Sequence, residues 1–379
     1  MNKKYFTLVF LFFLILFLTG MMETIIVGIM PAITEQFHTV NSITGQLITV
    51  YSIIFAVVGP LLIFLVRKLN LKKSILTFLV IFSFSNFLTF WSFNLPILFI
   101  SRIICAVSAS VLVAKTLESC FLIFKEDKKK LALVNMGFSS SIALGVPLGT
   151  YISSLVDWEN IFLGIGIISL VLFIILIFIY PETESNFKEN FKIKLSDLVT
   201  GNNLRLLLTT MLILTANMAF IGYISPYFIE GYSFNTSTIS WLLAILGIGG
   251  VCGSYVSAWL MEKFRARSSL AILLVLFIIF LIVISFRPPL YLLAFLLFFW
   301  NLCQWATGPI IQFEISNKAD EHSREQIISL NMSALNAGSA LGGLIGGIYI
   351  SYFSIHSIPL LAAFVALIAF LVIMTGGKK

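Results

Sequence analysis

Long apolar segments alternate with short polar ones along nearly the whole chain. An apolar window of about 20 residues is long enough for a helix to cross a bilayer. Twelve such windows predict membrane-spanning helices, at residues 6–30, 44–66, 74–94, 97–123, 131–154, 160–180, 204–228, 239–261, 269–286, 290–313, 328–351 and 357–375. We therefore predict an all-α polytopic membrane protein with twelve transmembrane helices, arranged as an N-terminal six-helix half (1–180), a cytoplasmic linker (181–203) and a C-terminal six-helix half (204–379).

The composition supports this class. Apolar residues make up 59% of the chain and charged residues 11%, whereas soluble domains carry about 25% charged residues. The apolar start of the chain is similar to a signal peptide, but no small-x-small cleavage pattern follows it, so we expect a retained first span. The cysteines lie in apolar segments without paired spacing and the histidines lie far apart, so we expect neither disulfides nor a metal site.

Lysine and arginine residues are strongly biased to one side of the predicted spans. With the N-terminus inside the cell, 21 of the 24 fall on cytoplasmic segments, Arg287 falls on an outer loop, and Arg102 and Lys115 fall within the fourth span. This bias predicts a multi-pass protein of the cell membrane with both termini in the cytoplasm. The anionic inner leaflet accounts for the net charge of +7, and we expect no nucleic-acid partner.

The two halves contain related segments. The fifth span, LVNMGFSSSIALGVPLGTYIS (133–153), and the eleventh, SLNMSALNAGSALGGLIGGIYIS (329–351), share Asn-Met, Ala-Leu-Gly and Tyr-Ile-Ser in the same order. A basic segment follows both the second and the eighth span. Two pseudo-symmetric six-helix halves, with the substrate site between them near the membrane midplane, are a transporter architecture.

Several motifs resemble those of a known family. ALGVPLGT (143–150), followed by WENIF (158–162), is similar to the fifth-helix antiporter motif of the major facilitator superfamily, in the form shared by its bacterial drug-efflux and sugar-efflux members. RIICAVSAS (102–110) resembles the fourth-helix motif, with Ala106 and Ser108 where glycines are usual. METIIVGIMPAI (22–33) and TGQLITVYSI (44–53) are similar to the first and second helices of the twelve-span drug:proton antiporter branch.

This resemblance implies a secondary active transporter that exports small amphipathic or drug-like compounds in exchange for protons, by alternating access. It implies no cofactor besides the proton gradient, and it implies a small-molecule substrate, protons and the lipid bilayer as partners of a monomer. A sugar or other small-metabolite exporter of the same family is the alternative, and a non-transporting membrane receptor is a third. No protease, hydrolase or phosphate-loop motif occurs in the sequence, so we expect neither an enzyme nor a primary pump.

Two helix-breaking residue types interrupt the fifth span, where Gly145 and Gly149 flank Pro147. Small residues four apart let helix backbones approach closely in lipid, and proline weakens the local hydrogen-bond ladder. We predict a tight but bendable helix contact here. The resemblance implies that it lies in the seam that seals the outer side between the halves, and Gly342 and Gly346 are predicted to match it in the eleventh span.

Ionisable residues inside the membrane cost roughly 2.5–3.5 kcal/mol each and need a reason. Glu23 and Arg102 lie at similar depths in the first and fourth spans, and the resemblance implies that both spans line the central cavity. Apolar surroundings favour the protonated acid, whereas a nearby guanidinium favours the carboxylate. We therefore predict proton coupling at this pair, with a static packing pair as the alternative. Lys115 and Glu118 are predicted to pair along their helix in a structural role.

Polar side chains in other spans are candidates for the substrate cavity, because a polar group in hydrocarbon needs a partner or a substrate. These candidates are Gln46, Tyr51, Asn217, Tyr223, Trp300, Asn301 and Gln304. Their few hydroxyls and amides lie among many Phe and Met residues, which favours an apolar or amphipathic cargo.

The loop after the second span resembles the cytoplasmic gate of the family but has Arg67 where an aspartate is expected. A plain positive-inside loop is the alternative interpretation of this basic cluster. The gate candidates are Arg67, Lys68, Lys72, Lys73 and, in the matching loop of the second half, Glu262.

Overall fold

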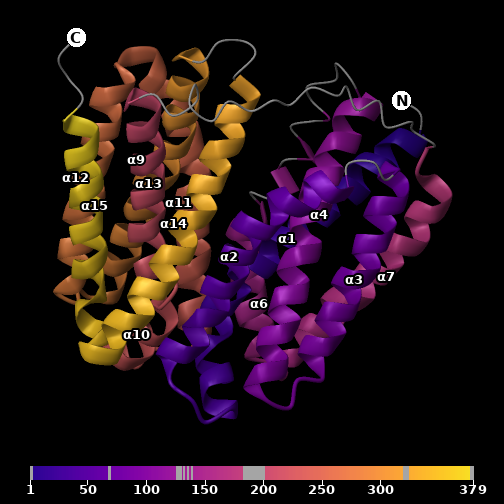
Figure 1. Ribbon diagram of the computed structural model, residues 1–379. Coiled ribbons are helices and arrows are strands. Elements are labelled where there is room, and N and C mark those ends of the chain that lie inside the picture. Colours follow the sequence, from indigo (N-terminus) through magenta and orange to yellow (C-terminus); the bar gives the residue numbers. More distant parts are fainter. Residues whose placement is uncertain are drawn as a thin grey trace. The chain divides into compact units, whose positions relative to one another are not determined.

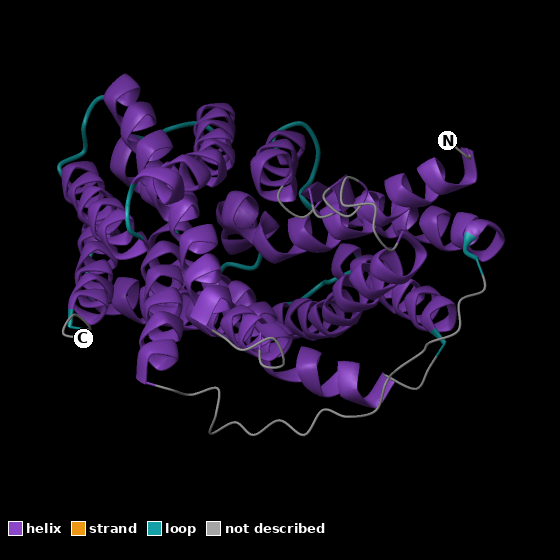
Figure 2. Ribbon diagram, turned by 90° about the horizontal axis from the view of Figure 1, so that it is seen from above, coloured by secondary structure: helices purple, strands orange, loops and turns teal. Residues whose placement is uncertain are grey.

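The computed structural model describes residues 3–66, 70–124, 130, 133–134, 136–137, 140–181, 201–318 and 324–375. Over these ranges the elements are helices joined by short loops, and no strand occurs (Figure 2). The helices labelled in Figure 1 and the shorter ones between them are α1 (Lys3–Gln36), α2 (Asn41–Val66), α3 (Leu71–Phe90), α4 (Leu95–Phe124), η1 (Ser141–Gly145), α6 (Val146–Ser153), α7 (Glu159–Ile179), α9 (Gly201–Ile221), α10 (Ile224–Tyr232), α11 (Thr236–Lys263), α12 (Ala266–Ser285), α13 (Leu290–Lys318), α14 (Arg324–Tyr352), η2 (Ile355–Ser357) and α15 (Ile358–Met374).

Ten of the described helices are long and apolar enough to cross a membrane. The helix α2 is apolar over Asn41–Val57, and the side chains of its remainder lie outside the described set, as does part of the predicted fifth span. These helices confirm the all-helical polytopic fold predicted from the hydropathy pattern. Apolar segments of this length can satisfy their backbone groups in lipid only as helices or closed barrels.

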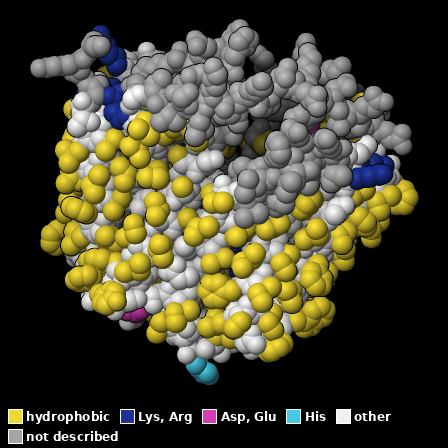
Figure 3. All heavy atoms as spheres, in the orientation of Figure 1, with side chains coloured by type: hydrophobic (Ala, Val, Ile, Leu, Met, Phe, Trp, Pro, Cys, Tyr) yellow, Lys and Arg dark blue, Asp and Glu magenta, His cyan; other side chains and the backbone are white. Residues whose placement is uncertain are grey.

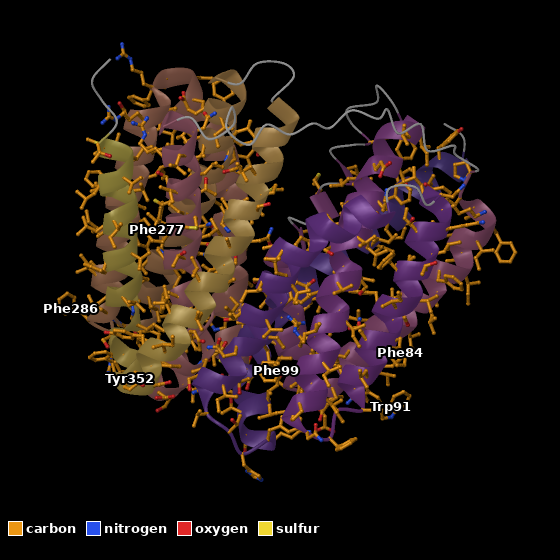
Figure 4. All side chains as sticks on the ribbon, in the orientation of Figure 1. Phe84, Trp91, Phe99, Phe277, Phe286 and Tyr352 are labelled. Atoms are coloured by element: carbon orange, nitrogen blue, oxygen red, sulfur yellow. The ribbon has the colours of Figure 1, made fainter. Side chains whose placement is uncertain are left out.

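Exposed apolar side chains form the lipid-facing surface of these helices. On α15, Leu360, Phe364 and Leu371 recur at helical spacing and are 45%, 62% and 52% exposed. Figure 3 shows such hydrophobic side chains over the described part of one face of the molecule. In Figure 4, Phe286 points away from its bundle whereas Phe277 lies among the helices, in agreement with exposed fractions of 80% and 1%.

The chain divides into two compact units. The first comprises Met1–Thr39 and Val50–Glu189, and the second comprises Val40–Thr49 and Asn190–Lys379. The boundary near residue 190 falls in the predicted linker, of which residues 182–200 lie outside the described set. The sequence did not predict that the first residues of α2 pack with the second unit.

The two units use the same packing plan. In the first unit α4 contacts α1 and α3, α3 contacts α7, and α1 contacts α6. In the second unit α13 contacts α9 and α12, α12 contacts α15, and α9 contacts α14. These five helices of the first unit (α1, α3, α4, α6 and α7) thus have counterparts with corresponding neighbours, which agrees with the internal repeat predicted from the fifth and eleventh spans.

A glycine stripe on α14 brings its backbone against that of α9. A Cβ atom added at Gly342 would lie 2.6 Å from the Thr215 carbonyl oxygen, and one at Gly346 would lie 2.9 Å from the Ala219 carbonyl oxygen. Backbone atoms of a packed helix cannot move aside as side chains do. The missing side chains are therefore what permits this helix contact.

The corresponding stripe in the first unit lies on η1 and α6 and faces α1. A Cβ atom at Gly145 would lie 3.0 Å from Met21 Cγ, and one at Gly149 would overlap Ile25 Cδ1. The π-helical turn η1 ends at Gly145, two residues before Pro147, and marks the predicted weakening of the backbone ladder. The described contacts of both stripes lie within their own units, and the expected seam between halves stays a prediction.

The predicted seventh span, residues 204–228, is not one helix. It breaks at Gly222 and Tyr223 into α9 and α10, and Tyr223 has φ −120° and ψ 17°. Pro226 has no backbone N–H, so it cannot donate to the Gly222 carbonyl as a continuous helix would require. A hydropathy window does not detect this break because both pieces remain apolar.

The glycine stripe on α14 leads to a stability prediction. We expect Gly342→Ala to lower the unfolding free energy by about 1–3 kcal/mol, because the added methyl would overpack the α9 backbone. The measurement is thermal unfolding of the detergent-solubilised protein. The control is Gly308→Ala on α13, where the added Cβ meets nothing within 4 Å. A Gly342→Ala variant as stable as Gly308→Ala would contradict the close packing.

Candidate functional site

Glu23, Tyr51 and Arg102 lie together in the first unit, contributed by α1, α2 and α4. Arg102 lies close enough to act electrostatically on both Glu23 and Tyr51. No direct ion pair joins Glu23 to Arg102 among the described residues, whereas Lys115 forms one with Glu118. The structure thus brings the predicted acid and base into one cluster without bonding them to each other.

Arg102 is fully buried, and its Nε, Nη1 and Nη2 atoms have no hydrogen-bond partner within the described part of the chain. An uncompensated buried charge costs several kcal/mol even after the surroundings relax. The guanidinium carbon lies 4.5 Å from the centroid of the Tyr51 ring. A cation over an aromatic face is stabilised by about 2 kcal/mol when water is excluded.

Tyr51 is fully buried as well, and both its hydroxyl group and its ring have partners in the first unit. Its hydroxyl donates to the Thr19 carbonyl oxygen of α1 at 3.3 Å. Phe55, one turn further along α2, stacks with the ring at a centroid distance of 6.1 Å. In this structure the ring faces Arg102 and is buried, and the role of Tyr51 in lining a substrate cavity stays a prediction.

Cys105 is a neighbour that the sequence analysis did not connect to this cluster. It lies one turn after Arg102 on α4 and is buried. Ser85 of α3 lies near its thiol. Spacing of three residues on one helix could have indicated the proximity to Arg102, whereas the contact with α3 required the tertiary structure.

Lys115 and Glu118 form the pair that the sequence predicts, with 2.9 Å between Nζ and Oε2. Lys115 is fully buried and the Glu118 side chain is 26% exposed. The lysine charge is thus compensated along its own helix, unlike the charge of Arg102. This contrast assigns the structural role to Lys115 and Glu118 and leaves Arg102 as the cation that lacks a hydrogen-bonded partner in the described cluster.

A second group of predicted residues lies in the second unit. Asn217 of α9 and Trp300 and Gln304 of α13 are buried, and Asn217 Oδ1, Trp300 Nε1 and Gln304 Oε1 have no hydrogen-bond partner among the described residues. Phe220, one turn from Asn217, packs against Trp300 at a ring-centroid distance of 5.1 Å. Phe277 of α12 packs against the same indole at 5.8 Å. Polar atoms left unpaired in an apolar setting are suited to a substrate or ordered water.

Asn301 and Tyr223 each form a hydrogen bond that joins two helices of the second unit. Asn301 Nδ2 donates to the Leu246 carbonyl oxygen of α11 at 2.7 Å, and its Oδ1 has no partner within the described ranges. Tyr223 Oη donates to the Gly343 carbonyl oxygen of α14 at 2.7 Å, and its ring is fully buried. The hydroxyl of Tyr223 is thus satisfied inside the second unit, and its predicted cavity role stays a prediction.

Gln46 lies near Tyr223, in the segment of α2 that groups with the second unit. Its Nε2 donates to the Ser42 carbonyl oxygen at 3.2 Å, and it is half-buried against Gly347 of α14. A Cβ atom at Gly347 would lie 2.6 Å from the Tyr223 hydroxyl oxygen. Glycine on α14 thus provides the space in which the start of α2 and Tyr223 pack together.

The gate candidates are only partly described. Arg67 and Lys68 lie outside the described residues. Lys72 Nζ donates to the Tyr180 carbonyl oxygen at 3.4 Å, while Lys73 and Glu262 are exposed. These positions are consistent with a basic loop at a membrane surface, and a gating role for them stays a prediction.

The family model for the Major Facilitator Superfamily matches residues 12–330 and 206–376 of the chain. A curated relative, the MFS-type transporter YbcL of Bacillus subtilis (strain 168), is 29% identical over 377 residues, which cover 98% of this chain and 96% of the relative. Both matches extend over both units.

Solved structures show the same fold at low sequence identity. A bacterial homolog of the human lysosomal transporter Spinster, in an inward-facing and occupied conformation, has a TM-score of 0.79 at 14% identity and covers 99% of this chain and 97% of its own. A D-xylose-proton symporter has a TM-score of 0.80 at 13% identity, with 99% and 98% covered. Helix order, packing plan and family match lead to one conclusion: the chain belongs to the major facilitator superfamily of membrane transporters, which are not enzymes.

Proposed function

We propose that the chain is a secondary active transporter that exports small amphipathic or drug-like compounds in exchange for protons. The observation that carries this proposal is the Glu23–Tyr51–Arg102 cluster. It places a carboxyl group that can take up or release a proton beside a fully buried guanidinium that has no hydrogen-bond partner in the described structure.

Glu23 is suited to exchange a proton because its environment can stabilise both the protonated and the ionised carboxyl group. The protonated carboxyl group is neutral and therefore compatible with apolar surroundings. Its neighbours along α1 include the buried Met22 and Ile26. When it is ionised, the Arg102 charge stabilises it. A cationic substrate would act on the carboxylate in the same way, so that substrate binding favours proton release.

The group of unpaired polar atoms in the second unit supports binding of the cargo. Asn217, Trp300 and Gln304 offer two acceptors and one donor beside the rings of Phe220 and Phe277. Apolar aromatic walls with a few polar atoms suit amphipathic molecules, because the rings bury the apolar part and the amides orient the polar part.

Export of a sugar or another small metabolite is the second candidate. The same amides favour it, because a sugar presents hydroxyl groups that can pair with both Asn217 and Gln304. The solved D-xylose-proton symporter shares the fold at 13% identity. The choice between the two candidates depends on which class of compound triggers proton movement.

The test of proton coupling uses inverted membrane vesicles preloaded with acid. We expect addition of cationic amphipathic drugs to trigger proton release, and we expect Glu23→Gln to reduce that release at least tenfold because the amide cannot exchange a proton. The measurement is quenching of a pH-sensitive dye. The control is Glu35→Gln, which removes an exposed carboxyl group from the same helix.

Two results would reject this assignment. Release by Glu23→Gln at the native rate would show that the proton is carried elsewhere. Release triggered by sugars and by none of the drugs would favour the metabolite exporter.

Substitution of Gln304 tests the proposed substrate wall. We expect Gln304→Leu to weaken binding of substrates with hydrogen-bond donors about fivefold, since a typical net hydrogen bond contributes about 1 kcal/mol, and to leave purely apolar dyes little affected. The measurement is a set of apparent affinities in the vesicle assay. The control is Gln46→Leu, whose amide bonds to its own helix. Equal losses for donor-bearing and apolar substrates would argue against direct contact.

A further inference from the structure

The position of Arg102 raises the question of what holds a charged group that has no hydrogen-bond partner. All three nitrogen atoms of the guanidinium are buried and unpaired within the described residues. The titratable groups that act on it are Cys105 of its own helix, Tyr51 of α2 and Glu23 of α1. From α3, Ser85 lies near Cys105, and its hydroxyl does not titrate near neutral pH.

The ring of Tyr51 lies against the guanidinium. The guanidinium carbon stands 4.5 Å from the ring centroid, within the range of a cation–π interaction. The ring itself is held at its far end by the hydrogen bond from its hydroxyl to the Thr19 carbonyl oxygen, and on its side by Phe55. Two helices of the first unit, α1 and α2, therefore determine where the aromatic face lies.

We propose that Tyr51 is a positioning residue for proton exchange: its ring holds Arg102 apart from Glu23 while Glu23 is protonated. This inference rests on the proposed function, because it assigns a role within the exchange cycle at Glu23. Tyr51 does not contact the proton or the substrate in this role. It acts through Arg102.

The mechanism is a competition between two partners for one guanidinium. The attraction of the aromatic face does not depend on pH near neutrality, whereas Glu23 attracts Arg102 strongly only when it is ionised. A protonated Glu23 therefore leaves Arg102 on the ring, and an ionised Glu23 competes for it. Because the ring stabilises Arg102 away from the acid, it favours the protonated state of Glu23.

Removal of the ring should shift this balance in one direction. Without the aromatic face, Arg102 would pair more readily with ionised Glu23, and the carboxyl group would lose its proton at a lower pH. We expect Tyr51→Leu to move the midpoint of Glu23 protonation by about one pH unit towards acid, which is a tenfold change in the equilibrium.

The measurement is an infrared titration of the purified full-length protein. The carboxylic C=O band that disappears in Glu23→Gln reports protonation of Glu23 directly and does not require transport. Tyr51→Phe keeps the ring and removes only the hydroxyl, so its midpoint should stay near that of the native protein. The matched control is Phe84→Leu, which removes an exposed ring of α3 in the same unit.

A second set of variants preserves the shape of the side chain in case Tyr51→Leu does not fold. Phenylalanine analogues at position 51 with one, two or three fluorine atoms withdraw electrons from the ring face and weaken its attraction for a cation. We expect the midpoint to move further towards acid with each fluorine. A midpoint that does not depend on fluorine number, or a shift in Tyr51→Phe as large as in Tyr51→Leu, would overturn the proposal.

The vesicle assay separates failure of this inference from failure of the proposed function. Drug-triggered proton release by the native protein, together with an unchanged infrared midpoint in Tyr51→Leu, would reject the role of Tyr51 and leave antiport in place. An acid shift of the midpoint without any proton release by the native protein would support the positioning role and reject antiport.

Discussion

A charged group inside an apolar helix bundle must be compensated, and Arg102 is compensated in an unusual way. It is fully buried and has an aromatic face, without a hydrogen bond, as its contact in the described structure. Lys115, on the same helix and equally buried, has a carboxylate at 2.9 Å. The difference matters because a cation already paired to an acid is fixed, whereas a cation held by a weaker, neutral partner can respond when a nearby acid changes its charge.

Close helix contacts at glycine residues recur in both units. On α14, Gly342 and Gly346 bring α9 near, and in the first unit Gly145 and Gly149 bring α1 near. Glu23 lies on α1 between the residues that contact these glycines, Met21 and Ile25. The span that carries the acid is therefore packed against the span that contains a π-helical turn and a proline. A rearrangement of the backbone hydrogen bonds in that span would therefore change the packing of α1 directly.

Much of the fold follows from sequence, because the length of an apolar segment and the backbone's need for hydrogen bonds in lipid leave few alternatives. The site was predictable in part for a related reason: a charge in a span is rare, so Glu23 and Arg102 stood out, and their similar depth indicated a shared environment. The role of Tyr51 was not predictable, because it depends on which way a side chain points around its helix. Hydropathy averages over that direction, and the same averaging concealed the break at Gly222 and Tyr223.

The distribution of polar groups differs between the two units, and this difference has a chemical consequence. The first unit holds Glu23, a carboxyl group whose charge can change, and the buried permanent cation Arg102. The second unit buries neutral amides and an indole, with Asn217, Gln304 and Trp300 each leaving a polar atom unpaired in the described structure. Neutral groups discriminate by shape and hydrogen bonding, and they do so at every pH. If cargo recognition relies on them, the preference among uncharged cargoes should be set by the second unit, while the pH dependence of transport should be set by the first. If one set of charged residues determined both the cargo preference and the pH dependence, a change in either property would also alter the other.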